Sequence, residues 1–263
     1  MTQSDTLGLK ERLRRKAVAS VGWVNATPGA CNAGRFLGTD DPDLLGWDTI
    51  RACLDEDGIF GFRLVATDRC DILSARLARM GFRIDFWDVF TAGADSVREA
   101  CSREIVTDPP DGVDLLTGAE ALSPGNVAEA FACMERNGLA PMDAAFLSGE
   151  AIPSALVTAT EPSGRVVATA YGYFPHNDFS PNARNAWGGL VSVDPDYRAR
   201  GLGVLVNAHM LLDCIDRMGA ERVHELVART NTPSRRVLER CGLKLDEGLR
   251  CGIAQMGQER FTR

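Results

Sequence analysis

The sequence predicts an α/β protein with a mixed sheet, in which a smaller N-terminal α/β domain precedes a larger C-terminal one. Three observations support this fold class. Apolar segments of strand length alternate with segments of helical spacing throughout the second half of the chain. One strand, Val191–Val193, leads through a glycine turn directly into an amphipathic helix. The segment Thr107–Gly112, rich in proline and aspartate, is the best linker candidate, and it places the domains at residues 1–105 and 106–263.

The N-terminal domain begins with a segment in which Leu9, Leu13 and Ala17 share one helical face. It also contains an internal echo, because Leu64–Phe82 follows the pattern of Leu226–Leu243. Each segment has a strand ending in Leu-Val-Ala, a polar turn, a helix, and then Arg-x-Gly followed by an apolar residue. Two interpretations stay open: a chance similarity, or a first domain that is a degenerate copy of the second.

The C-terminal domain shows a regular succession of strand and helix patterns. In chain order the expected elements are a strand at Val113–Leu116, helices at Pro124–Arg136 and Pro141–Leu147, strands at Ala155–Ala159, Val166–Tyr173 and Trp187–Val193, a helix after Gly203, a strand at Val223–Ala228, a helix at Thr232–Cys241, and short strands near Leu243–Leu245 and Leu249–Ala254. The helical spacing of Val127, Phe131 and Met134 supports the first helix. A turn at Glu161–Gly164 separates the strands on either side of it.

The two later helices have clear faces and ends. The helix after Gly203 carries its apolar residues on one face, at Val204, Ala208, Leu211, Ile215 and Met218. Gly219 ends this helix, and Gly242 ends the next one. The helix that begins near Thr232 has threonine or asparagine as its cap and proline in its first turn.

The turn before the first of these helices has the composition of a pyrophosphate site, Arg198-x-x-Gly201-x-Gly203. Gly201 and Gly203 have no Cβ, so main-chain N–H groups there can approach an anion closely. The helix adds N–H groups without intrahelical acceptors and the positive end of its dipole. Arg198 and Arg200 supply positive charge at the rim.

Composition excludes several classes of function. The net charge of −7 disfavours nucleic-acid binding, because phosphate contacts need a basic surface. The chain has no run of about 18 apolar residues, so we expect no membrane span. Its eight cysteines form no Cys-x-x-Cys pair and only three histidines are present, so no metal site is expected. We expect free thiols and a cytoplasmic protein.

The C-terminal domain resembles the GNAT superfamily of acyl-CoA-dependent N-acetyltransferases. The matching residues are the strand Val191–Val193, the segment Tyr197–Gly203, and a second motif, Asn231-x-x-Ser234-x-x-Val237-Leu238-x-x-x-Gly242-Leu243; together they cover about Val113–Ala254. The resemblance implies two adjacent parallel strands, at 187–193 and 223–228. These would splay apart so that the pantetheine arm of acetyl-CoA lies in the gap.

The resemblance also implies a cofactor site along the first splayed strand and the helix after it. The implied acetyl-CoA-binding residues are Val191, Ser192, Val193, Arg198, Ala199, Arg200, Gly201, Leu202, Gly203, Val204 and Asn231. Main-chain groups of Val191 and Val193 would pair with the pantetheine amides, and the N–H groups from Arg198 to Val204 would hold the pyrophosphate. The N-terminal domain lacks the Arg-x-x-Gly-x-Gly pattern, so we do not expect it to bind CoA itself.

The implied reaction is direct attack of an amine on the thioester, which needs a group that takes the amine proton and donors for the oxyanion. Many family members have a tyrosine as general acid on the asparagine-initiated helix, but Leu238 occupies the matching position here. The candidate catalytic residues are therefore Tyr173, His176 and Ser192, with Tyr171 and Asp178 as further alternatives. A main-chain N–H near Val193 is the candidate oxyanion donor.

The expected acceptor is the primary amine of a small metabolite, such as an amino acid, polyamine or aminoglycoside, with peptide N-termini as the second class. A non-catalytic acyl-CoA-binding sensor or regulatory module is the alternative, motivated by Leu238. A tandem enzyme in which both halves shape the substrate site is a third interpretation. The expected partners are acetyl-CoA and the amine acceptor, with a homodimer as a further option; nucleic acid and membranes are not expected.

Overall fold

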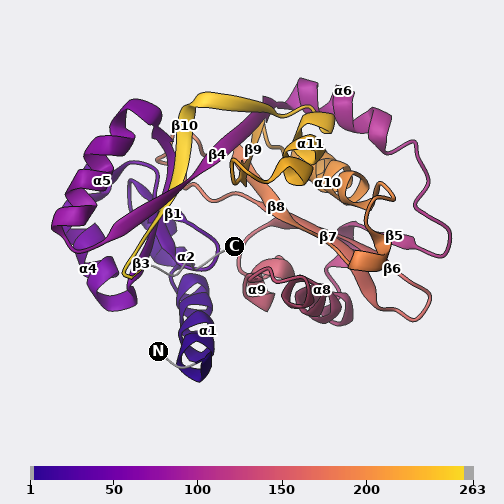
Figure 1. Cartoon of the computed structure of the whole chain (residues 1–263), viewed down its shortest axis with the longest axis horizontal. Coiled ribbons are helices and arrows are strands. Elements are labelled where there is room, and N and C mark those ends of the chain that lie inside the picture. Colours follow the sequence, from indigo (N-terminus) through magenta and orange to yellow (C-terminus); the bar gives the residue numbers. More distant parts are fainter. Residues whose placement is uncertain (1–2, 258–263) are drawn as a thin grey trace. The chain divides into compact units, whose positions relative to one another are not determined.

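The computed structural model describes residues 3–257 and confirms an α/β fold with mixed strand pairing. The chain forms two compact units (Figure 1). Among the described residues, the first unit holds 3–89, 175–183 and 246–257, and the second holds 90–174 and 184–245. Two segments from the later part of the sequence therefore join the first unit. The domain boundary expected at residue 105 stays a prediction.

The first unit alternates short strands and helices after a long N-terminal helix. Its elements are α1 (Gln3–Ala19), α2 (Val21–Ala26), β1 (Ala30–Asn32), β2 (Leu37–Thr39), α3 (Pro42–Leu45), α4 (Trp47–Asp57), β3 (Ile59–Ala66), a 3-10 turn (Thr67–Arg69), α5 (Cys70–Arg79), and parts of β4 (Arg83–Gly93) and β10 (Lys244–Gln255). The strand order is β1-β2-β3-β10-β4. Strands β2 and β3 are parallel, whereas β3 and β10 are antiparallel.

Aromatic residues form the centre of this unit. Phe60 and Phe62 on β3 are fully buried, with ring centroids 5.5 Å apart in an edge-to-face arrangement. Trp47 of α4 stacks on Phe62 at 6.4 Å. Leu13 and Ala17 of α1 are buried, which confirms the apolar face expected there. Such aromatic pairs contribute more than their buried area alone, by about 1 kcal/mol each.

The second unit contains the succession of elements that the sequence predicts, together with two helices, α6 and α7, that it does not. They are the end of β4, α6 (Ala94–Glu104), β5 (Asp114–Leu116), α7 (Gly118–Ala121), α8 (Pro124–Arg136), α9 (Ala144–Leu147), β6 (Ser154–Thr160), β7 (Val166–Tyr173), β8 (Asn185–Val193), a 3-10 turn (Pro195–Tyr197), α10 (Leu202–Leu212), a π-helical turn (Asp213–Arg217), β9 (Arg222–Val227), α11 (Thr232–Arg240) and the start of β10. The strand order is β4-β9-β8-β7-β6-β5. Strands β5 to β8 pair antiparallel, and β8 and β9 pair parallel.

One expected element is wrong. Instead of two short terminal strands, the chain forms a single strand, β10, that runs from Lys244 to Gln255. The sequence Asp246-Glu-Gly248 looks like a turn, and Asp246 Oδ1 does accept a local hydrogen bond of 3.0 Å from Gly248 N. Pairing of Leu249–Gln255 with β3 keeps the chain extended, because the tertiary ladder outweighs the local turn preference.

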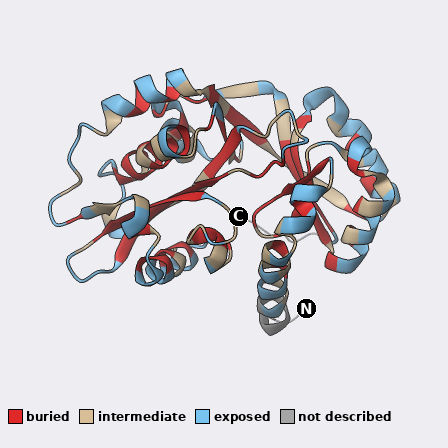
Figure 2. Cartoon of the chain, turned by 180° about the vertical axis from the view of Figure 1, so that it is seen from behind, coloured by how far each residue is buried: buried red, intermediate tan, exposed pale blue. Residues whose placement is uncertain are grey.

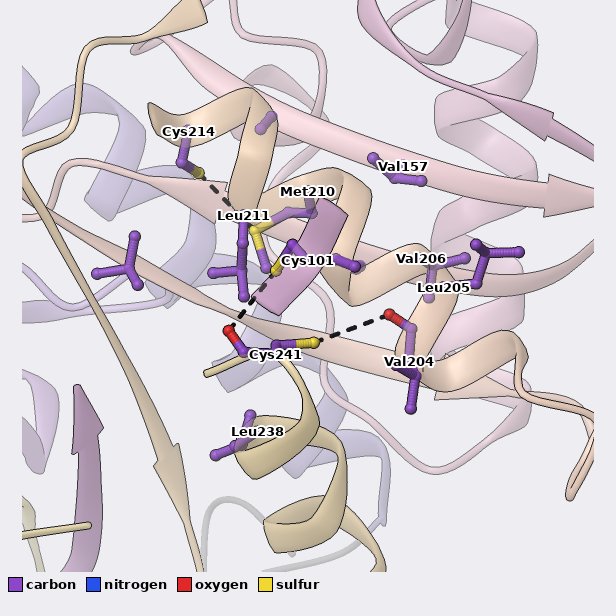
Figure 3. Close-up of a cluster of buried hydrophobic side chains, with 14 of the residues drawn as sticks. Cys101, Val157, Val204, Leu205, Val206, Met210, Leu211, Cys214, Leu238 and Cys241 are labelled. Carbon is purple, nitrogen blue, oxygen red and sulfur yellow. Dashed lines mark hydrogen bonds between the residues drawn. The ribbon is translucent and has the colours of Figure 1, made fainter. Parts of the chain in front are cut away.

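Helix α10 lies very close to the sheet of the second unit. It is apolar on most of its surface, and strands β6 and β7 beside it are buried along their length (Figure 2). Figure 3 shows Val204, Met210 and Leu211 of this helix in one apolar cluster with the buried Leu238 of α11. The close approach depends on a glycine in β7: a Cβ on Gly172 would lie 2.5 Å from Cys214 Sγ and 2.7 Å from Met210 Sδ.

We predict that Gly172→Ala lowers the free energy of unfolding by about 1–3 kcal/mol, because the added methyl group forces the packed sulfur atoms of α10 and its π-helical turn to move. The matched control is Gly125→Ala in α8, where a Cβ has no neighbour within 4 Å and alanine favours the helix. Urea denaturation followed by circular dichroism measures both. Equal stabilities for the two variants would contradict the proposed tight contact.

Candidate functional site

Strands β8 and β9 separate part of the way along their length. They pair from Asn185 to Gly188 on β8 and from Arg222 to Glu225 on β9, and the pairing stops there although both strands continue. This confirms the splayed parallel pair expected from the sequence. On its other edge β8 stays paired with β7 as far as Val193. The gap between β8 and β9 is therefore an opening on one side of an otherwise intact sheet.

A β-bulge accompanies the separation. Leu190 has a φ of 51°, which is uncommon for a residue other than glycine. The register between β7 and β8 shifts between Thr169 and Tyr171, and Thr169 Oγ1 donates to Leu190 O at 2.8 Å. Bulges bend a strand and increase its local twist, which is what turns the end of β8 away from β9.

The main-chain groups of Val191 and Val193 face the gap. Asp194 N donates to Val167 O of β7 at 2.8 Å. Because successive residues of a strand direct their N–H and C=O groups to opposite edges, those of Val193 and Val191 point away from β7. A ligand with amide groups in an extended conformation can pair with this edge, as a further strand would.

The turn after β8 brings helix α10 to the same end of the gap. Ala199 and Gly201 have φ values of 60° and 85°, and Gly201 precedes the first residue of α10. No side chain caps this helix. The N–H groups of Leu202 and Gly203 therefore have neither an intrahelical acceptor nor a capping side chain, which favours an anion at this terminus, whereas Val204 N donates to Gly201 O at 3.1 Å.

Gly203 lies beside the open edge of β8. A Cβ at this position would lie 3.5 Å from Val193 Cγ2 and 3.9 Å from side-chain atoms of Val191 and Val237. These are ordinary contact distances, so an alanine fits but a long side chain would extend into the space between β8 and α11. On the helix side of this turn lies a cavity of about 50 Å³. Its lining residues are Arg200, Gly201, Val204, Leu205, Glu104, Thr107, Asp108, Pro110 and Arg240.

A buried carboxylate fixes the end of β8. Asp194 accepts from Arg136 at 2.9 Å, from Asn137 at 2.6 Å and from Arg165 at 2.5 Å. Burial opposes its ionisation, but the hydrogen bonds from Arg136, Asn137 and Arg165 outweigh it and lower the pKa of Asp194. The network ties the strand end to α8 and to the turn between β6 and β7.

Arg198 occupies the open edge in this structure. Its Nε donates to Val193 O at 3.0 Å, and its guanidinium also donates to Asn137 Oδ1 at 3.2 Å. Arg200 extends over the ring of Tyr197, 5.5 Å from its centroid. Both arginines are exposed and stand beside the α10 terminus, where positive charge favours a phosphate.

Helix α11 begins at the residue that the sequence singles out. Asn231 is the N-cap, and its side chain accepts from Ser234 N at 3.2 Å. Leu238 is buried in the core of the second unit, as Figure 3 shows, and does not face solvent. The local role of Asn231 as a helix cap is thus clear, and its contact with a cofactor stays a prediction.

The three candidate catalytic residues lie in different surroundings. Tyr173 is fully buried, with its ring 5.8 Å from Tyr171 and 5.5 Å from Trp187. Ser192 is buried, and its Oγ lies 3.8 Å from Cys133 Sγ. His176 belongs to the first unit, where its Nδ1 lies 2.6 Å from Asp40 Oδ2. The second unit therefore contains Tyr173 and Ser192, and the role of all three stays a prediction.

Sequence reasoning missed Glu225, the last residue of β9 that pairs with β8. Its carboxyl is buried and accepts a hydrogen bond of 2.8 Å from Asn207 Nδ2 of α10. Burial raises the pKa of Glu225 to about 7, and the bond from Asn207 opposes this only in part. The available signal was a charged residue inside the expected buried strand Val223–Ala228.

A protonated Glu225 also completes the bonding of its partner. Asn207 Oδ1 is buried and has no hydrogen-bond partner among the described residues. A carboxylic acid can donate to that oxygen while it accepts from Nδ2, so the pair is satisfied in the neutral form. Glu225 thus closes the core at the point where β8 and β9 separate.

The sequence profile of the acetyltransferase (GNAT) family matches residues 129–243. These residues include β8, the glycine turn, α10, β9 and α11, which form the splayed strands and the site beside them. The chain carries an acetyltransferase domain of the GNAT family. The family uses acetyl-CoA as its cosubstrate. Membership of the family supports acyl-CoA-dependent acetyl transfer as the general class of reaction. No curated protein sequence matches the chain.

Solved structures with the same fold extend over both units. A GCN5-related N-acetyltransferase from Kribbella flavida is 17% identical, with a TM-score of 0.57, and the match covers 95% of this chain and 97% of that one. A Drosophila protein is 14% identical, with a TM-score of 0.56 and coverage of 98% and 97%. A tandem GNAT protein from the clavulanic acid biosynthesis pathway is 16% identical, with a TM-score of 0.53 and coverage of 85% and 76%. At these identities the similarity concerns the fold.

Residues 3–257 contain no group of three or more histidine, cysteine, aspartate or glutamate side chains that could hold a metal ion. In the same part of the chain no helix has both the length and the apolar character needed to cross a membrane.

The raised pKa of Glu225 predicts a pH-dependent stability. The folded chain holds this proton up to a pH of about 7, whereas the ordinary value is 4.5. The contribution of this proton to the free energy of unfolding is therefore fully present below pH 4.5 and is lost as the pH rises through 7. The total loss is about 3 kcal/mol. Glu225→Gln, which stays neutral and can donate to Asn207 Oδ1, should remove most of this loss.

Urea denaturation of both proteins at pH 5 and pH 8 measures the effect. We expect similar stabilities at pH 5 and a more stable glutamine variant at pH 8. The matched control is Glu221→Gln, because Glu221 is exposed one residue before β9 and should leave the pH dependence unchanged. A glutamine variant that is less stable than the wild type at pH 8 would contradict the raised pKa of Glu225.

Proposed function

We propose that the chain transfers an acetyl group from acetyl-CoA to the primary amine of a small molecule, by direct attack in a ternary complex. Peptide N-termini are the second acceptor class. The observation that carries the proposal is the open main-chain edge of Val191 and Val193 beside the uncapped N-terminus of α10. One site thus offers strand-like pairing for an amide-containing arm and N–H groups for a pyrophosphate.

Each implied cofactor residue has a distinct part in this proposal. Val191 and Val193 pair with the pantetheine amides through their main chain, and Ser192 between them keeps the strand in register with β7. The segment from Arg198 through Ala199, Arg200, Gly201, Leu202 and Gly203 to Val204 holds the pyrophosphate. Arg198 must release Val193 O when the arm binds, and its guanidinium is then available to a phosphate. Asn231 contacts the arm from the start of α11.

The proton transfers are assigned to the residues around the end of β7 and along β8. We propose Tyr173, His176 and Ser192 as the candidates for taking the amine proton and protonating the leaving thiolate. Tyr171 is less suited, because its hydroxyl already donates to Phe146 O at 2.8 Å. A main-chain N–H near Val193 is the proposed donor to the tetrahedral oxyanion, a kind of donor that can contribute several kcal/mol.

A non-catalytic acyl-CoA-binding module is the second candidate function. The observation that favours it is the burial of Leu238, which provides no acid on the helix where many family members have a tyrosine. Such a module would bind acetyl-CoA with the same residues and would release no free CoA when amines are added. The two functions therefore share a binding site and differ in turnover.

Compartment and assembly complete the proposal. All eight cysteines are free thiols in the structure, and six of them are buried: Cys31, Cys101, Cys133, Cys214, Cys241 and Cys251. Free thiols are typical of a reducing compartment, so we propose a cytoplasmic protein. We also propose that the chain is able to form a homodimer, which size-exclusion chromatography with light scattering tests directly.

We predict that Gly203→Glu weakens acetyl-CoA binding about 100-fold, or about 2.7 kcal/mol, because its carboxylate enters the gap and repels the pyrophosphate. Gly203→Ala is the matched control, since a Cβ there makes only ordinary contacts. Thermal-shift titration with acetyl-CoA measures both, because a ligand of the folded state raises the melting temperature. Equal shifts for the glutamate variant and the wild type would contradict the proposed site.

We predict that Tyr173→Phe lowers kcat about 100-fold with little change in acetyl-CoA binding, which is the size expected for loss of a general acid. Release of free CoA across a panel of amines measures kcat. Tyr171→Phe should lower stability and leave kcat nearly unchanged, because its hydroxyl is bound to a main-chain carbonyl. If wild-type protein binds acetyl-CoA but no amine releases CoA, the binding-module function replaces the enzyme.

A further inference from the structure

The first unit contains a cavity of about 250 Å³ at the point where its own parallel strands separate. Strands β2 and β3 pair only at Gly38 with Gly61 and at Thr39 with Phe62. Strand β3 then continues to Ala66, whereas the chain turns away after Thr39 into α3. Carboxyl ends of parallel strands are the usual place for ligands in α/β sheets.

The cavity has an apolar wall. Trp47 of α4, Leu64 and Val65 of β3, and Ile72 and Leu73 of α5 line it. Ile72 is 67% exposed, which is high for an isoleucine beside a cavity. The space is large enough for a small metabolite.

Most of the charged groups at the cavity already have partners. Asp41 caps α3 by accepting from Asp43 N at 3.2 Å and from Leu44 N at 3.0 Å. Asp43 accepts from Arg69 at 2.5 Å and from Trp47 Nε1 at 3.3 Å. These two carboxylates and Arg69 thus maintain the wall, and together they carry one net negative charge.

One carboxylate and one guanidinium keep bonding capacity. The side chain of Asp40 is only 4% exposed, and both hydrogen bonds that it accepts, from His176 Nδ1 and Ser180 Oγ, end on Oδ2. Its Oδ1 accepts no hydrogen bond from the described residues, and Asp40 lines the cavity. The guanidinium of Arg76 lies 3.9 Å above the Trp47 ring and forms no ion pair within the described residues. A carboxylate can bind its edge while the face stays stacked.

We propose that this cavity is a binding site for an apolar α-amino acid. The ammonium group binds Asp40 Oδ1, the carboxylate binds Arg76, and the side chain lies against Leu64, Val65 and Leu73. A simple amine would leave Arg76 without a partner, and a simple carboxylic acid would meet the buried Asp40 carboxylate. A zwitterion with an apolar side chain matches both charges and the apolar wall.

A phosphate-containing ligand does not fit this site. The residues that follow β2 are Asp40, Asp41, Pro42 and Asp43, whereas the turn after β8 contains arginines and glycines. Three carboxylates against two guanidiniums repel a pyrophosphate. The two units therefore have parallel strands that separate in the same way but turns of opposite charge.

Isothermal titration of the full chain with leucine and phenylalanine tests the proposal. Two analogues of leucine isolate the charges: 3-methylbutylamine lacks the carboxylate, and 4-methylpentanoate lacks the ammonium group. We expect the amino acids to bind with submillimolar affinity and each analogue to bind at least tenfold more weakly. Absence of binding by either amino acid at millimolar concentration overturns the proposal, as does equal binding of the analogues.

Variants locate the site. Arg76→Ala should weaken leucine binding at least tenfold, and the matched control Arg79→Ala, an exposed position on the same helix, should not. Ala66→Trp should block the cavity from its exposed rim without a change in the core. This second variant tests the site even if Arg76→Ala alters the structure of α5. Gly203→Glu should leave leucine binding intact, so failure of the acetyl-CoA site is distinguishable. Binding that survives both Arg76→Ala and Ala66→Trp overturns the proposal.

Discussion

The end of hydrogen bonding between β8 and β9 after Gly188 and Glu225 is the constraint on which the candidate site depends. A main-chain N–H or C=O group that loses its partner in the sheet needs another one, because an unsatisfied buried group costs about 1–3 kcal/mol. In this structure Arg198 supplies a donor to Val193 O. The same requirement makes the open edge a binding surface for an extended ligand.

Several interactions in the second unit keep the strands apart. The bulge at Leu190 turns β8, pairing with β7 holds its other edge, and the Asp194 network attaches its end to α8. Helix α10 approaches the sheet closely because Gly172 has no side chain. Glu225 lies where the pairing stops, and its neutral form satisfies Asn207 within the core. The site is thus held by packing and buried hydrogen bonds and not by the turn alone.

The two units share an order of elements and differ in chemistry. Each run has a strand, a helical crossover, a parallel strand, a helix and a further strand: β2 to β4 begins in the first unit, and β8 to β10 begins in the second. This order agrees with the internal echo in the sequence, and it favours a degenerate copy over chance. The turn after the first strand carries aspartates in one case and arginines with glycines in the other. A fold can therefore be repeated while the ligand it suits changes.

The sequence by itself determined the features that depend on neighbouring residues. The period of apolar residues located α8 and α10, the glycines located their turns, and the pattern from Val191 to Gly203 located the candidate cofactor site. Tertiary structure alone decided the rest. It made Asp246-Glu-Gly248 part of the single strand β10, although the segment looks like a turn. It also buried Glu225 against Asn207 and placed Asp40 and Arg76 at one cavity. Pairing across a sheet and the pKa of a buried acid depend on residues far apart in the chain, and local patterns do not carry that information.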